Sequence, residues 1–143
     1  MMNTKDKAGF VLLGFVVWAA ATSVYRMTGS YFFEGAAAGY WLNVIITGIV
    51  YAAVSLGLMK WRKIKQQDWL QGAICIALPG MLGEVPILAD FSGLMSNMQP
   101  ATAGRYAAFL FGGYSLLIGV SWLMSAKASS QSGSDAQLIS TEQ

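Results

Sequence analysis

Two carboxylates stand in an apolar stretch of sequence that is interrupted by prolines. The segment ALPGMLGEVPILADFSG, residues 77–93, contains Glu84 and Asp90 together with Pro79 and Pro86. Each proline lacks the amide proton that the helical hydrogen-bond ladder needs, so we expect a kink near Pro79 and a helix end around Glu84. A carboxylate beside a broken membrane helix can bind a proton or a cation with the help of the freed carbonyl groups.

The same carboxylate also has a structural interpretation. At about 1.5 Å per residue, Glu84 lies roughly 22 Å along a helix that starts at Trp69, short of the far side of a roughly 30 Å hydrocarbon core. A carboxylate at a helix C-terminus and a cation at a helix N-terminus both oppose the helix dipole. Glu84 and Arg105 are such a pair, and Arg26 is a second candidate partner. The sequence leaves two hypotheses open: an interhelical ion pair, or a site that couples protons or cations.

Other reactive groups are scarce. The chain has no histidine and one cysteine, and its carboxylates form no cluster with metal-ligand spacing. Histidine is the most common general base and a common transition-metal and haem ligand. We therefore expect no enzymatic activity, no catalytic residue, no metal site and no cofactor. The formal net charge of +2 is too small to indicate a nucleic-acid partner.

The elements that must position these residues are apolar helices. Of the 143 residues, 55% are hydrophobic and only 11% are charged, far fewer charges than the quarter typical of soluble domains. Four apolar stretches are each long enough to cross a bilayer. We expect spans at about residues 8–26, 40–59, 69–89 and 105–126. The prediction is an all-α protein with a four-helix transmembrane domain over residues 1–126 and a disordered polar cytoplasmic tail over residues 127–143.

The basic residues predict the orientation of the bundle. With four spans, one side of the membrane would carry both termini and the loop KWRKIK, and the other side would carry only Arg26 and Arg105. The basic residues expected on the first side are Lys5, Lys7, Lys60, Arg62, Lys63, Lys65 and Lys127. Because cytoplasmic loops are enriched in Lys and Arg, both termini should be cytoplasmic. An alternative is a cleaved signal peptide ending at Ala21, which would leave three spans.

Small residues recur along the fourth predicted span at Gly104, Ala108, Gly112, Ser115 and Gly119. Spacings of three and four residues place them on one helix face, where they permit close approach to another helix. We expect this face to pack inside the bundle. Dimerisation with a second copy, or contact with another membrane protein, is the alternative use of such a face, and the lipid bilayer is the expected surrounding partner.

Three segments carry a family resemblance: YRMTGSYFF after the first span, ALPGML in the third, and PATAGRYAAFLFGGYSLL at the start of the fourth. The chain resembles an uncharacterised bacterial family of small four-span membrane proteins, catalogued as a domain of unknown function. That resemblance implies a four-helix fold in the bacterial plasma membrane, and no activity. Where an aspartate is expected soon after LPGML, this chain has Glu84.

Two functions follow from these observations. The first is a non-enzymatic membrane bundle or accessory subunit of unknown biochemical activity, in which Glu84 is structural. The second is a small proton- or cation-coupled transporter that uses Glu84.

Overall fold

The computed structural model describes the backbone of residues 2–141 and the side chains of residues 2–132. Its elements are α1 Thr4–Phe33, α2 Ala37–Trp61, the 3₁₀ turn η1 Gln66–Asp68, α3 Trp69–Ala89, α4 Phe91–Leu94, the 3₁₀ turn η2 Pro100–Thr102, and α5 Ala103–Thr141. Within the described residues there is no β-strand. The predicted all-α class is confirmed.

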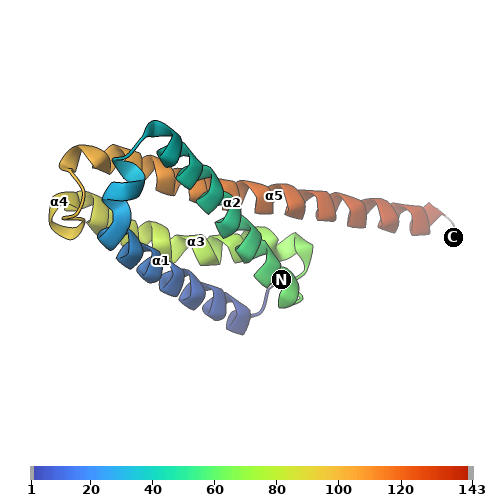
Figure 1. Ribbon diagram of the computed structural model, residues 1–143. Coiled ribbons are helices and arrows are strands. Elements are labelled where there is room, and N and C mark those ends of the chain that lie inside the picture. The colour runs from blue at the N-terminus through green and yellow to red at the C-terminus, as the bar shows by residue number, and fades with distance from the viewer. Residues whose placement is uncertain (1, 142–143) are drawn as a thin grey trace.

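The four long helices form a bundle, and α5 extends well beyond it on the side where α1 begins (Figure 1). Two of the main contacts join helices that are not consecutive in sequence, because α1 packs mainly against α3 and α2 mainly against α5. The contact between α3 and α5 joins these two pairs, whereas α1 and α2 touch each other only slightly. The bundle is therefore tight at its α3–α5 side and loose between α1 and α2.

The outer surface of the bundle is apolar. Among the described residues, four helices are long and apolar enough to cross a membrane. In the most apolar 18-residue stretch of each helix, at most 39% is buried inside the bundle. Large aliphatic side chains point outward from all sides, including Leu12, Ile49 and Val85, which are 64%, 56% and 63% exposed. An apolar exterior of this extent requires lipid rather than water around it.

The third helix does not end where its prolines suggested. α3 continues through Pro79 and Pro86 to Ala89, so the prediction of a helix end around Glu84 is wrong. Proline removes one hydrogen bond from the ladder, and neighbouring helices in a membrane can compensate for that loss. The consequence is that Glu84 projects from a continuous helix, and its side chain is buried.

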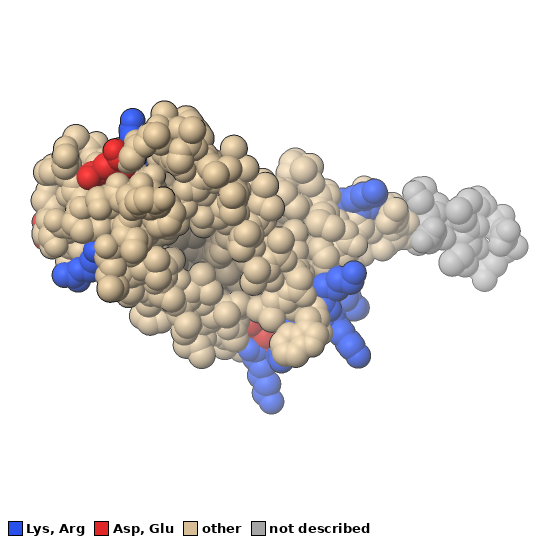
Figure 2. Space-filling view, in the orientation of Figure 1, with Lys and Arg blue, Asp and Glu red and all other residues tan. Residues whose placement is uncertain are grey.

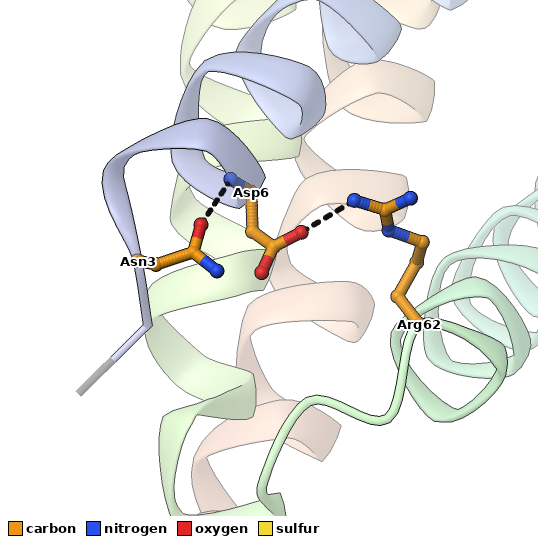
Figure 3. A network of polar contacts seen from close by, with 3 residues as sticks. All are labelled: Asn3, Asp6 and Arg62. Atoms are coloured by element: carbon orange, nitrogen blue, oxygen red, sulfur yellow. Dashed lines mark hydrogen bonds and ion pairs between the residues drawn. The ribbon is translucent and has the colours of Figure 1, made fainter.

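The amino-terminal end of the bundle is joined by a small polar network (Figure 3). Asn3 caps α1 by accepting a hydrogen bond of 2.7 Å from the amide of Asp6. The Asp6 carboxylate in turn lies 2.6 Å from the guanidinium of Arg62, which follows α2. After Arg62, Lys63 has a positive φ of 55°, and the amide of Ile64 donates a hydrogen bond to the carbonyl oxygen of Met59. This left-handed residue terminates α2.

The polar tail differs from its prediction. The backbone of residues 127–141 continues α5 as a helix, whereas its composition predicted disorder; residues 142–143 lie outside the described residues. A helix that is already formed extends without a new nucleation step. Serine hydroxyls in this region bond to carbonyl groups four residues earlier, as Ser129 does to Ser125 and Ser130 to Ala126.

Candidate intramembrane binding site

A cavity of about 130 Å³ lies between the four long helices. Side chains of α1, α2 and α5 form most of its wall, and α3 contributes Glu84. The residues that line it are Gly14, Val17, Trp18, Ala21, Tyr25, Thr47, Gly48, Tyr51, Glu84, Tyr106, Phe109, Leu110, Gly113 and Tyr114. Among the described residues that line the cavity, Glu84 is the only formally charged one. Figure 2 shows the surface hollowed between the helices at the side of the bundle.

The Glu84 side chain is 5% exposed and has neutral partners. Its Oε1 atom accepts a hydrogen bond of 3.1 Å from the indole Nε1 of Trp18 on α1. The hydroxyl of Tyr106 on α5 lies 3.5 Å from the same oxygen. The other oxygen, Oε2, is buried and has no hydrogen-bond partner among the described residues. Because a buried carboxylate charge without a counter-charge is strongly unfavourable, this group requires a proton or a cation from elsewhere.

A glycine positions the indole that reaches Glu84. A Cβ atom on Gly83 would overlap the ring of Trp18, so only a glycine lets this indole lie directly against α3. Gly14 makes a similar approach possible one turn earlier on α1, where a Cβ atom would overlap the backbone oxygen of Ile76 on α3. Because Gly14 and Gly83 have no side chains, α1 and α3 lie close enough for the hydrogen bond between Trp18 and Glu84.

Two tyrosines, Tyr51 and Tyr114, bring further hydroxyl groups to the α2–α5 side of the cavity. The rings of Tyr51 and Tyr114 meet edge to face at 6.0 Å between centroids, and the Tyr114 hydroxyl lies against α3 at Gly80, where a Cβ atom would overlap it. Near the other end of the cavity, the Tyr25 hydroxyl donates a hydrogen bond of 3.2 Å to the side-chain oxygen of Asn43. The interior is therefore aromatic and carries hydroxyl groups at several depths.

The two arginines proposed as partners of Glu84 are elsewhere. Arg105 donates a hydrogen bond of 3.0 Å to the carbonyl oxygen of Phe33 and lies 5.6 Å from the ring centroid of Tyr40. It therefore serves the C-terminus of α1, where a cation suits the helix dipole. Arg26 is exposed on α1, which continues for two turns beyond it. Among the described residues, no ion pair joins Glu84 to either arginine, so no contact supports the ion-pair hypothesis.

Comparison with known proteins identifies the family. Residues 32–128, about two thirds of the chain, match the family of unknown function DUF5367. The chain belongs to the DUF5367 family. This result confirms the resemblance noted from the sequence. No curated protein and no solved structure matches this DUF5367 chain.

The small-residue face of this DUF5367 protein is on the outside. Gly104, Ala108, Gly112 and Ser115 are exposed, and Gly119 is half-buried. A Cβ atom on Gly104 or Gly119 would meet no atom within 4 Å, and one on Gly112 would make only ordinary contact. The prediction that this face packs inside the bundle is wrong. The buried stripe of α5 lies on the opposite side of the helix and contains Tyr106, Phe109, Leu117, Ser121 and Ser125.

Trp18 and the tyrosines of the cavity were not selected as site residues from the sequence of this DUF5367 protein. One signal for Trp18 was present, because it stands in the middle of an apolar span rather than near an end, where membrane tryptophans gather. No comparable signal marks Tyr106. Among the described residues, no group of three or more His, Cys, Asp or Glu side chains could hold a metal ion.

Proposed function

We propose that this protein is a small proton- or cation-coupled transporter of the bacterial plasma membrane, with Glu84 as the group that binds the coupling ion. The observation that carries the proposal is the environment of Glu84. Its carboxyl group is 5% exposed, has one unpartnered oxygen and lines a cavity between the spans. Intramembrane carboxyl groups that face a cavity commonly belong to ion pathways.

The alternative, a bundle or accessory subunit without a transport role, has less support. That alternative was based on an ion pair between Glu84 and an arginine, whereas Arg105 forms a hydrogen bond to the end of α1. With that explanation removed, a purely structural carboxyl group would occupy a position where a hydrophobic residue of similar volume is usually at least as stabilising. The proposed transporter performs no covalent chemistry and needs no cofactor.

Proton movement in reconstituted vesicles tests the proposal. Vesicles that contain a pH-sensitive dye are exposed to gradients of inorganic monovalent cations and of small alkylammonium ions. Wild-type protein should move protons in response to at least one of these cations, and Glu84→Gln should reduce that flux to the level of empty vesicles. Asp90→Asn is the matched control, because Asp90 is an exposed acid just after α3. Equal fluxes for Glu84→Gln and wild type would reject the proposal.

We also propose that both termini are cytoplasmic. Lys and Arg side chains gather at the end of the bundle that carries the amino terminus (Figure 2), and loops with this bias stay in the cytoplasm. A reporter fused after Lys127 should be active only if it is of the type that works in the cytoplasm. Activity of an export-dependent reporter at that position would reverse the orientation.

A further inference from the structure

We infer that the cavity beside Glu84 binds the head of a lipophilic monocation, such as an alkyl trimethylammonium ion, whose apolar tail leaves the bundle between α1 and α2. This inference rests on the proposed function, since it names the substrate class for the same site. Four observations support it: the charge of the lining, its aromatic content, the cavity volume and the loose contact between α1 and α2.

The charge of the lining selects the sign of the ligand. Glu84 is the single formally charged residue among those that line the cavity. Its Oε2 atom is unpartnered, and its Oε1 atom has only the neutral Trp18 and Tyr106 as donors. One positive charge would balance the ionised carboxylate. An anionic or zwitterionic head would bring a negative charge for which the lining offers no balancing cation.

The aromatic content favours an organic cation over a metal ion. Six of the lining residues are aromatic: Trp18, Tyr25, Tyr51, Tyr106, Phe109 and Tyr114. A small inorganic ion needs several oxygen ligands at short range, and the lining of the cavity is almost entirely apolar. An alkylammonium ion instead gains from contact with aromatic faces and loses little by leaving water, because its charge is covered by methyl groups.

The volume limits what can be enclosed. A cavity of about 130 Å³ is close to the size of an engineered cavity of about 150 Å³ that binds benzene. A trimethylammonium head is of that order, and a long alkyl chain is not. The rest of an amphiphilic ligand must therefore lie outside the cavity.

The path for that tail is between α1 and α2, which touch only slightly. Val17 and Ala21 line the cavity from α1 and are themselves exposed on the outside of the bundle. On α2 the wall includes the half-buried Thr47 and the buried Gly48, which lies against Gly113 of α5. A ligand dissolved in the bilayer can thus reach Glu84 sideways from the lipid, with its tail kept in hydrocarbon.

Equilibrium binding tests the inference without any ion gradient. Wild-type protein in lipid nanodiscs is titrated with radiolabelled hexyltrimethylammonium, and 2,2-dimethyloctane, which has carbon in place of the charged nitrogen, is used as the neutral competitor. We expect saturable binding that Glu84→Gln weakens by about tenfold or more, as expected for loss of a charged partner. Glu84→Asp should retain most of the affinity. Equal competition by the neutral analogue and the cation would overturn the inference and leave an apolar cavity without charge selectivity.

Two glycine variants test whether the cavity itself is the site. Gly113 lines the cavity, and a Cβ atom there would meet nothing within 4 Å, so Gly113→Leu should fill the space without a backbone clash. Gly119→Leu adds the same side chain to the same helix outside the lining. Binding should fall by about tenfold or more in the first variant and stay unchanged in the second. Equal affinity in both variants would place the ligand elsewhere.

The two proposals fail in different ways. Absence of hexyltrimethylammonium binding, with Glu84-dependent proton flux still driven by inorganic cations, would reject the substrate class alone. Binding that depends on Glu84, together with proton flux that does not, would reject coupled transport and leave the cation site in place. Circular dichroism and gel filtration of each variant establish that a loss of binding is not a loss of fold.

Discussion

The close approach of α1 to α3 predicts that one added methyl group at Gly14 destabilises the bundle. A Cβ atom there would overlap the backbone oxygen of Ile76 and lie 2.8 Å from its carbonyl carbon. A backbone carbonyl within a helix cannot rotate away, so the helices must move apart. Overpacking of this kind costs about 1–3 kcal/mol, and alanine is favoured over glycine in a helix by about 1 kcal/mol. We expect Gly14→Ala to lose up to about 2 kcal/mol of unfolding free energy.

The matched control is Gly112→Ala on α5. Its Cβ atom would lie 3.7 Å from a methyl group of Val44, an ordinary contact, so the variant keeps the helix-propensity gain without the clash. The difference between the two variants isolates the packing effect and should be about 1–3 kcal/mol. Reversible unfolding in mixed detergent micelles measures it. Equal stability of Gly14→Ala and Gly112→Ala would refute the reasoning, because the clash with Ile76 is the only large difference between them.

Two further predictions concern polar contacts in the C-terminal half of α1 and just after it. The Glu34 carboxylate accepts hydrogen bonds from the amide of Gln99 and the hydroxyl of Thr102, which lower the pKa of Glu34 below its ordinary value of 4.5. These hydrogen bonds stabilise the folded protein above pH 4.5, and their stabilisation is lost as the pH falls through the lowered pKa. Thermal denaturation of Glu34→Gln should therefore depend less on pH in that acidic range than thermal denaturation of wild type. Tyr25→Phe removes the bond to Asn43 and should reduce the unfolding free energy by about 0.5–1.5 kcal/mol in the same micelle titration, and an unchanged value would mean that water replaces the bond.

The number and type of the helices could be predicted from the sequence, because a bilayer imposes a length and an apolar composition on each span. The apolar run over residues 69–89 coincides with α3, since a basic loop precedes it and polar residues follow it, although its prolines suggested an earlier helix end. The helix after Lys127 was not predicted, because the polar composition of this segment does not show that a long helix precedes it and can continue.

The partner of Glu84 could not be predicted, because it depends on how each helix is rotated about its axis. Matching charges by sign and depth suggested Arg105. The fold instead directs Arg105 to the end of α1 and brings Trp18 to the carboxylate. The same uncertainty affected α5, on which small and large residues form stripes on opposite sides. Small residues indicate where helices can approach closely, but here the side that carries Tyr106 and Leu117 faces the bundle.

The packing of α1 on α3 and of α2 on α5 also determines the order in which the chain can assemble. During synthesis, α1 and α2 enter the bilayer first, yet each has its main contact with a helix made later. When α3 emerges, Glu84 can meet Trp18, but Tyr106 has not yet been made. Until α5 is inserted, Glu84 must therefore stay in the bilayer with contacts only to the helices that have already been made. A chain interrupted before residue 103 would have the carboxyl group and lack the wall that encloses it.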